Sequence, residues 1–257
     1  MFNFDNTRYN RQVQMPEWTI ERQTLLDNAK VAVIGAGGVK SSLLYALTCA
    51  GVGHIRVIDF DKVELSNLNR QFLYNTNDIG QFKATAAVSK LKLLNPDIII
   101  EPIIDKITEQ NISSLLNDFD FIVEGGESPF GRNLVNEFCL STAKPFVHSS
   151  AQFNYGYVFS VVPKLNTACY ACFYPDDIHR TETTGAVPVS VLSVQIAGTL
   201  GASEVLKYFL GYEDNLIVNR KLVFSSLLLS EEFSYIKQNR RRKCPVCSKI
   251  FPKFAIH

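Results

Sequence analysis

Residues 30–38 read KVAVIGAGG, an apolar run that leads into three glycines. The run is short and rich in β-branched side chains, which is typical of a buried strand, and the glycines permit a tight turn before a helix. Residues 40–50 have a helical pattern, and a second apolar run, HIRVID, follows at residues 54–59. Strand, glycine turn, helix and strand within about thirty residues predict a βαβ unit and therefore a parallel sheet.

The alternation of helices and strands continues along the chain. We expect a helix over residues 18–26 and another over residues 83–94, which ends at Asn95-Pro96 because a residue before proline rarely stays helical. The remaining expected elements are a strand at 98–104, a short helix at 113–117, a strand at 119–123, a helix at 132–143, a strand entered at 145–148, antiparallel strands at 155–163 and 222–229, and a long helix at 188–210. The sequence thus predicts an α/β fold, Rossmann-like and doubly wound, with a mainly parallel sheet extended by antiparallel strands.

The composition excludes some broad classes of function. The chain has 257 residues, with 26 Lys and Arg against 25 Asp and Glu, which leaves a formal net charge of +1. No large positive field is therefore available to hold nucleic acid, and we expect no nucleic-acid partner. No apolar run approaches the ~20 residues that span a bilayer, and the N-terminus lacks the features of a signal peptide, so we expect a cytoplasmic protein without membrane contact.

The glycines of the first turn are candidates for nucleotide binding. Gly35, Gly37 and Gly38 stand where a strand meets a helix, and the start of such a helix offers free amides to a phosphate. Asp59 closes the second strand, about twenty residues further on, where an acid can bind ribose hydroxyls. Lys40 occupies the place of the third glycine in the dinucleotide fingerprint, which weakens an interpretation as an NAD-dependent oxidoreductase.

Four of the six cysteines form two C-x-x-C pairs, Cys169 with Cys172 and Cys244 with Cys247. Two such pairs are the usual ligand set of a closed, tetrahedral structural Zn²⁺ site, which we favour over a redox role for either pair. A metal at this place would fasten the C-terminal segment to the middle of the chain.

The other two cysteines, Cys49 and Cys139, lie within apolar helical stretches. We expect both to be small core residues, because an unpaired cysteine in such a stretch packs like a small apolar side chain.

Segments far apart in the chain add to the nucleotide signals. They are residues 8–12 (RYNRQ), 59–71 (DFDKVELSNLNRQ) and 80–83 (GQFK). With the glycine turn and the cysteine pairs, they resemble the adenylating superfamily of ubiquitin-activating-type enzymes. This superfamily includes the sulfur-carrier adenylyltransferases of the molybdopterin-synthase and thiamine systems and the microcin C-type peptide adenylyltransferase. The resemblance runs from residue 8 to residue 247, and residues 59–71 are its most specific part.

The resemblance implies ATP as a substrate and assigns roles to individual residues. Gly35, Gly37 and Gly38 would contact the nucleotide, and Asp59 would hold its ribose. The residues expected around the phosphates are Asp61, Asn67, Arg70 and Lys83. Arg11 would reach the γ-phosphate, in this family often from the other subunit of a homodimer. Arg11, Arg70 and Lys83 would supply the positive charge that the reaction needs.

The expected Mg²⁺ site departs from the family pattern. Family members carry an Asp after the fourth parallel strand, and Glu127 occupies that place here. Glu is one methylene longer but is still a hard oxygen ligand suited to Mg²⁺. We therefore expect Glu127 to hold the metal, with Glu124 as the alternative.

We expect one continuous domain over residues 1–257, because no repeat or low-complexity linker interrupts the chain. Its parts would be an N-terminal arm and helix at 1–29, a nucleotide-binding half at 30–150, and a substrate-side, zinc-binding half at 151–257.

The implied reaction is attack of a substrate's C-terminal carboxylate on the α-phosphorus of ATP, which yields an acyl-adenylate and pyrophosphate. No general base is required, because a carboxylate is already ionised at neutral pH. Residues 179–188 contain no cysteine, so we expect no stable thioester intermediate.

The sequence leaves the substrate open between a peptide and a small ubiquitin-like carrier protein that ends in Gly-Gly. Some short segments are closer to the peptide enzymes, but those carry a long N-terminal clamp, and the first expected strand here begins at Lys30. An alternative of another class is a non-catalytic relative that binds a leader peptide for a partner enzyme, which Glu127 keeps open. An NAD-dependent oxidoreductase would not account for Arg70, Lys83 or the cysteine pairs.

Overall fold

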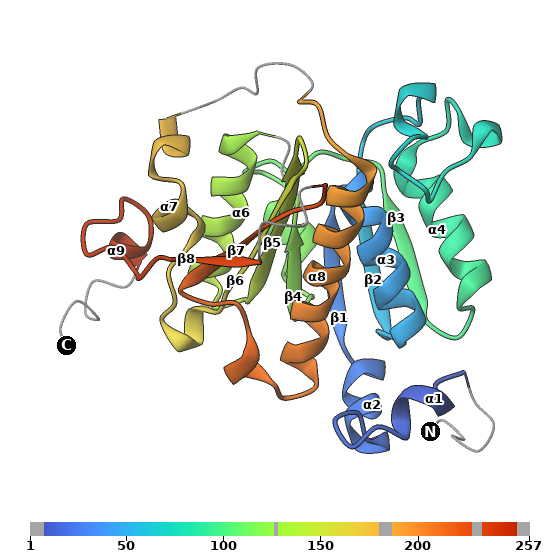
Figure 1. Cartoon of the computed structure of the whole chain (residues 1–257), viewed down its shortest axis with the longest axis horizontal. Helices are drawn as coiled ribbons and strands as arrows, with labels where there is room; N and C mark the ends of the chain where they lie inside the picture. Colours follow the sequence, from blue (N-terminus) through green and yellow to red (C-terminus); the bar gives the residue numbers. More distant parts are fainter. Residues whose placement is uncertain (1–7, 126–127, 180–186, 228–232, 251–257) are drawn as a thin grey trace.

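The computed structural model describes residues 8–125, 128–179, 187–227 and 233–250. Within these residues, one eight-stranded sheet runs through the molecule in the order β3-β2-β1-β4-β5-β6-β7-β8 (Figure 1). The strands are β1 (Lys30–Ile34), β2 (His54–Ile58), β3 (Ile99–Ile103), β4 (Phe121–Glu124), β5 (Phe146–Gln152), β6 (Tyr155–Val161), β7 (Arg220–Ser225) and β8 (Ser234–Lys237).

The sheet changes character between β5 and β6. The strands from β3 to β5 pair in parallel. Strand β6 reverses direction, and β7 and β8 continue the sheet in antiparallel pairing. The predicted fold class, a mainly parallel sheet extended by antiparallel strands, is therefore confirmed.

Helices cover both faces of the parallel part (Figure 1). The described helices are α1 (Asn10–Val13), α2 (Ile20–Asp27), α3 (Gly38–Ala50), α4 (Lys83–Leu94), α5 (Ile112–Leu116), α6 (Pro129–Ser141), α7 (Tyr170–Phe173), α8 (Val191–Phe209) and α9 (Cys247–Ile250), with short 3₁₀ turns such as η1 (Leu65–Asn67) and η4 (Pro175–His179). Helix α3 packs against α4 and α8 on one face, and α6 packs against α5, α7 and α9 on the other. Because both faces are covered, Val31, Ala32 and Val33 of β1 are fully buried. None of the described helices is long and apolar enough to cross a membrane.

Most expected elements exist, with shifted ends. Helix α4 has the expected bounds, whereas α6 begins at Pro129 because the Ser128 side chain caps its first turn by accepting the Gly131 amide at 3.1 Å. The sequence analysis did not predict β8, α7 or α9. Cys139 is buried as expected, but Cys49 is exposed, since it lies on the outer side of α3.

The connections around β1 and β4 create a switch point in the sheet. The chain leaves β1 toward β2 and leaves β4 toward β5, so the two connections diverge at the carboxyl ends of these strands. The two ends also lie very close together, because a Cβ on Gly125 would be 1.9 Å from the carbonyl oxygen of Ile34. Ligands of open α/β sheets bind in the crevice that such a switch point leaves.

Helix α8 packs closely against α3 because Gly198 has no side chain. A Cβ at this position would lie 2.0 Å from the Val39 carbonyl oxygen and 2.1 Å from Ser42 Oγ.

The substitution Gly198→Ala gains about 1 kcal/mol of helix propensity but overpacks this contact, so we expect a net loss of about 2 kcal/mol in the free energy of unfolding. Urea denaturation measures the free energy of unfolding of this variant. The control is Thr199→Ala, at the exposed neighbouring position. Equal stabilities of the two variants would contradict this account of the packing.

Candidate active site

A cavity of about 290 Å³ lies at the carboxyl ends of β1, β4 and β5. It is lined by residues of four groups of elements: the glycine loop and first turn of α3 (Gly35, Gly37, Gly38, Val39, Lys40), the segment after β2 and the start of α4 (Asp59, Asp61, Gln71, Lys83), the end of β4 and α6 (Glu124, Gly125, Arg132), and β5 (His148, Ser149, Ser150, Ala151). Six of the residues that the sequence analysis proposed for the nucleotide are among them: Gly35, Gly37, Gly38, Asp59, Asp61 and Lys83.

Asp59 joins the two loops that line one end of this cavity. Its Oδ2 accepts the Ala36 amide at 2.7 Å, and its Oδ1 accepts the Asp61 amide at 2.8 Å. Burial raises the pKa of Asp59, although both amides act in the opposite direction. Since each carboxylate oxygen can accept a second hydrogen bond, Asp59 can also receive a ribose hydroxyl.

A positive charge and an unsatisfied amide oxygen stand opposite the glycine loop. The Lys83 ammonium lies 2.9 Å from Asp61 Oδ2 and is almost fully buried. Beside it, Gln71 is 5% exposed, and its Oε1 has no hydrogen-bond partner among the described residues. With the free amides at the start of α3, these groups can bind phosphate oxygens and their counter-ion.

A smaller cavity of about 60 Å³ opens beside Asp59. Its apolar lining includes Ile58, Phe60 and Ile107, and Gly35 and Asp59 line both cavities. An apolar cleft that meets an acid and then a glycine loop has the order of base, ribose and phosphate that a nucleotide needs.

Two other proposed residues, Asn67 and Arg70, lie outside the lining. Asn67 Oδ1 accepts the Glu64 amide at 3.2 Å and closes the 3₁₀ turn η1. The Arg70 guanidinium donates to the Ser66 carbonyl at 2.9 Å and to Asn69 Oδ1 at 3.0 Å. Both side chains are thus held within their own loop, and their proposed roles stay predictions.

Arg11 lies far from the cavity of its own chain. It is exposed on α1, next to Gln12, whose side chain donates to the Ala50 carbonyl at the C-terminal end of α3. The cavity lies at the opposite, N-terminal end of α3. Figure 1 shows α1 below the sheet, near the C-terminal end of this helix. Within one chain, Arg11 and the glycine loop are therefore separated by the length of this helix. Glu127, the proposed Mg²⁺ ligand, lies outside the described residues.

The far side of the cavity holds a buried polar cluster that sequence reasoning missed. His148 Nδ1 donates to Glu124 Oε2 at 2.5 Å, and His148 Nε2 accepts from Ser150 Oγ at 3.0 Å. Burial would raise the pKa of Glu124, but the His148 hydrogen bond and nearby cations bring it below its usual value. Burial lowers the pKa of His148, so the pair is an ionised carboxylate beside a neutral imidazole. His148 is the third residue of β5, and a polar side chain directly after the apolar Phe146 and Val147 was the signal available in the sequence.

Arg132 connects this cluster to the cysteine-rich part of the chain. Its guanidinium donates to the Tyr170 hydroxyl at 3.5 Å, and that hydroxyl donates to Asp177 Oδ2 at 2.7 Å. Tyr170 is fully buried and lies in α7, between Cys169 and Cys172. The far side of the cavity thus rests on the segment that carries two of the cysteines.

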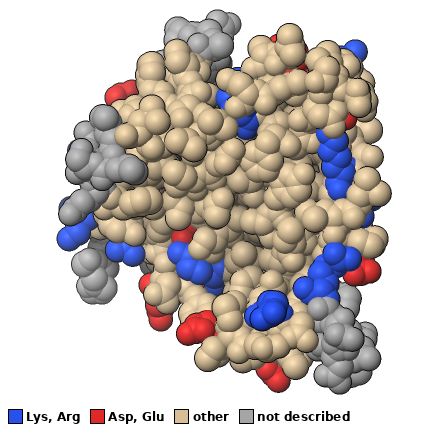
Figure 2. Space-filling view, turned by 45° about the vertical axis from the view of Figure 1, so that its right-hand side comes forward, with Lys and Arg blue, Asp and Glu red and all other residues tan. Residues whose placement is uncertain are grey.

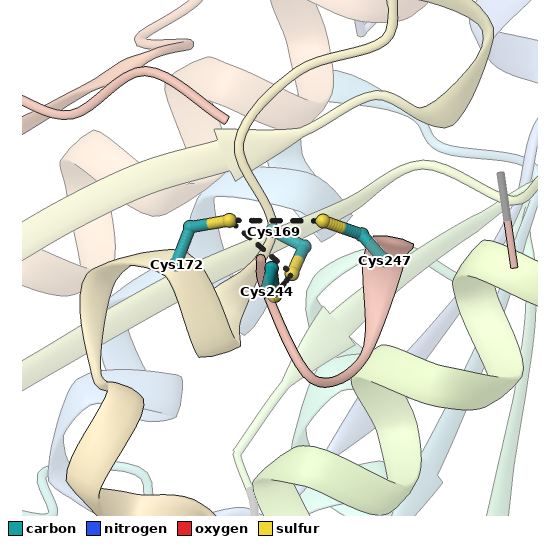
Figure 3. Close-up of side chains that lie close together, drawn as sticks. All are labelled: Cys169, Cys172, Cys244 and Cys247. Carbon is teal, nitrogen blue, oxygen red and sulfur yellow. Dashed lines mark hydrogen bonds between the residues drawn. The ribbon is translucent and has the colours of Figure 1, made fainter. Parts of the chain in front are cut away.

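The four cysteines of the two C-x-x-C pairs come together although they lie far apart in the sequence. Figure 3 shows Cys169 and Cys172 pointing toward Cys244 and Cys247. The sulfur atoms of neighbouring cysteines are 3.7 to 3.8 Å apart, and all four lie within 4.8 Å of one another. A disulfide needs about 2.05 Å, whereas four ligands at about 2.3 Å from a tetrahedral Zn²⁺ stand about 3.8 Å apart. The cluster therefore fits a metal such as zinc.

The fold and the cavity define a nucleotide-binding α/β protein, and sequence comparison gives its family. The ThiF family pattern matches residues 9–246, so the chain belongs to the ThiF family. A sulfur carrier protein adenylyltransferase of Thermus thermophilus is 35% identical in an alignment 250 residues long, which covers 93% of this chain and 90% of the relative. The SAMP-activating enzyme E1 of Haloferax volcanii is 30% identical over 245 residues, with coverages of 94% and 88%.

Solved structures show the same fold. The crystal structure of E. coli MccB with ATP has a TM-score of 0.82 at 24% identity, over 95% of this chain and 75% of that chain. The resemblance to ubiquitin-activating-type adenylyltransferases is thereby confirmed. The chain is an ATP-using enzyme of the adenylyltransferase class.

Lys40 makes the stability of the protein depend on pH. It is 4% exposed, and burial lowers its pKa from 10.5 to about 8. The folded state disfavours the charged form of Lys40, so burying the ammonium lowers the free energy of unfolding by the full amount below pH 8. This loss of stability disappears as the pH rises from about 8, the pKa in the folded state, to 10.5, the pKa in the unfolded state. We expect the free energy of unfolding of the wild type, relative to Lys40→Met, to rise on the order of 3 kcal/mol over this window. Urea denaturation of both proteins across the window measures it, and parallel pH profiles would contradict the assignment.

Proposed function

We propose that this enzyme adenylates the C-terminal carboxylate of a peptide or of a small ubiquitin-like carrier protein. The carboxylate attacks the α-phosphorus of ATP, and pyrophosphate leaves. The observation that carries the proposal is the single continuous lining from an apolar cleft, past Asp59 and the glycine loop, to a polar pocket at β5. A nucleotide occupies the first part in this arrangement, and the second part remains for an acyl substrate.

The residues at the nucleotide end have distinct tasks in this proposal. The amides at the start of α3 and the Lys83 ammonium neutralise phosphate charge, while Asp59 fixes the ribose. Positioning and charge neutralisation supply most of the catalysis in such a transfer, so no general base is assigned. Mg²⁺ would add positive charge at the phosphates, and Glu127 is its proposed ligand.

The carrier-protein branch draws support from the names of the relatives. The Thermus thermophilus relative is a sulfur carrier protein adenylyltransferase, and it is similar over nearly its whole length. The peptide branch rests on short segments of the sequence alone. In either branch we propose that no cysteine thioester forms; the loop at issue lies largely outside the described residues.

A homodimer would explain the position of Arg11. Because α1 lies at the wrong end of α3 to serve its own cavity, Arg11 can act at the phosphates only in another subunit. The centre of the face in Figure 2 carries few charged side chains, which suits contact with a second copy. We place this dimer in the cytoplasm, where reduced thiolates stay available to the metal.

ATP–pyrophosphate exchange tests the proposed reaction. We expect exchange with a peptide or carrier protein that has a free C-terminal carboxylate and none with the C-terminal amide.

Asp59→Asn replaces the charged carboxylate that joins the two loops by a neutral amide, so the Kd for ATP should rise roughly ten- to hundred-fold. The exposed Asp214→Asn, with the same change of charge, should leave it unchanged. ATP binding without exchange for any substrate would favour the non-catalytic alternative, in which the chain binds a leader peptide for a partner enzyme.

The cysteine cluster is proposed to hold structural Zn²⁺, and its loss should be visible in metal content and in stability. We expect about one zinc per wild-type chain, since four thiolates complete a closed tetrahedral site. Cys244→Ala should lose the metal and lower the free energy of unfolding by roughly 3 kcal/mol or more. Elemental analysis and urea denaturation measure both, with the exposed Cys49→Ala as the control. Full zinc content in Cys244→Ala would contradict the site.

A further inference from the structure

Lys40 is a buried cation that the proposed nucleotide contacts do not use. It stands in the first turn of α3, and its side chain passes the carboxyl ends of β1 and β4 toward β5. Its Nζ lies 3.3 Å from both the carbonyl oxygen and the hydroxyl of Ser149, and the residue lines the large cavity. A long amine thus occupies the place where the dinucleotide fingerprint has a glycine.

Within the part of the chain that the structure describes, the Lys40 ammonium forms no ion pair with a carboxylate at contact distance, whereas Lys83 in the same cavity has Asp61 at 2.9 Å. The charge of Glu124 acts on Lys40 and raises the pKa of the ammonium, but Glu124 Oε2 accepts a hydrogen bond from His148 Nδ1. The two contacts to Ser149 are also longer than the 2.7 to 2.9 Å of a charge-assisted hydrogen bond. A buried cation held this weakly is costly, and a bound anion would remove the cost.

The position of Lys40 selects the kind of anion. The groups suited to ribose and phosphate, Asp59, Lys83 and the glycine loop, lie on one side of the cavity. The Lys40 amine reaches away from them, to β5, where Ser149, Ser150 and Ala151 form the wall. An anion there would be adjacent to the phosphates without being one of them. A single carboxylate matches the single charge of the ammonium.

We propose that the Lys40 ammonium binds the reacting carboxylate of the acyl substrate and holds it beside the α-phosphate; this rests on the proposed function. One carboxylate oxygen accepts from the ammonium while the other forms the bond to the α-phosphorus. The bond from that phosphorus to the bridging oxygen breaks, and pyrophosphate leaves with the electron pair. Lys40 keeps its proton throughout, so it orients and stabilises the nucleophile without acting as an acid.

Binding measurements on the full chain test this role. The nucleotide is an ATP analogue with a methylene between the α- and β-phosphorus, which cannot react. The probes are peptides ending in Gly-Gly or Gly-Asn, each as the free acid and as the C-terminal amide. Calorimetry gives the Kd of each probe and of the analogue for the wild type and for Lys40→Met, which keeps the unbranched side chain up to the position of Cε and removes the amine. Lys92→Met, at an exposed position of α4, is the control for net charge.

We expect the wild type to bind a free acid roughly ten- to hundred-fold more tightly than its amide. Lys40→Met should lose this preference and keep the Kd of the analogue within about two-fold, while Lys92→Met behaves like the wild type. Without ligands at pH 7, Lys40→Met should be at least as stable as the wild type, because it removes an unpaired buried charge.

Three results would overturn the proposal. Retention of the preference by Lys40→Met would show that another group binds the carboxylate. An equal loss of affinity for the analogue would assign the amine to a phosphate, and a less stable Lys40→Met without ligand would make the lysine structural. A wild type that does not distinguish acid from amide would overturn the proposed function together with this one.

Discussion

The two hydrogen bonds of the Asp59 carboxylate hold the nucleotide end of the enzyme together. One comes from the amide of Ala36, in the glycine loop after β1, and the other from the amide of Asp61, after β2. The Tyr74 hydroxyl adds a bond to the Ala36 carbonyl at 2.7 Å. Without these bonds the glycine loop and the Lys83 region would be independent loops. The carboxylate therefore gives the proposed phosphate site its shape before any nucleotide binds, and such preorganisation lowers the cost of binding.

The rest of the cavity is built by more distant contacts. Its far wall comes from β5 and from α6, and α6 packs against α7 and α9, which carry Cys172 and Cys247. The four sulfurs bring the segment at Cys244 back to the segment at Cys169. A metal that binds them closes a long loop, and the free energy of that closure stabilises the whole C-terminal part of the fold. The protein thus combines a locally connected sheet with one long-range fastening.

The sequence predicted features with local causes and missed those with distant ones. Helix α4 was predicted with its observed bounds because Asn95-Pro96 ends it, and Asp59 could be placed because it follows a strand. Strand β8 was missed because all four of its residues are exposed, so no alternation of apolar side chains marks it. The pairing of His148 with Glu124 depends on the adjacency of β4 and β5, which no local pattern encodes.

Because Tyr170 lies between two of the clustered cysteines, the two halves of the candidate active site depend on this cluster to different degrees. This side chain contacts Arg132 in the cavity wall, and its helix has Cys169 as N-cap and contains Cys172, two of the proposed zinc ligands. The loops proposed to bind the nucleotide, by contrast, follow β1 and β2 and contain none of the four clustered cysteines. Loss of zinc from the proposed cysteine site would therefore loosen the wall that faces the second substrate, while the loops proposed for ATP would keep their own contacts. The supply of zinc would then set the fraction of chains with a complete site for the second substrate, while the affinity for ATP would stay the same.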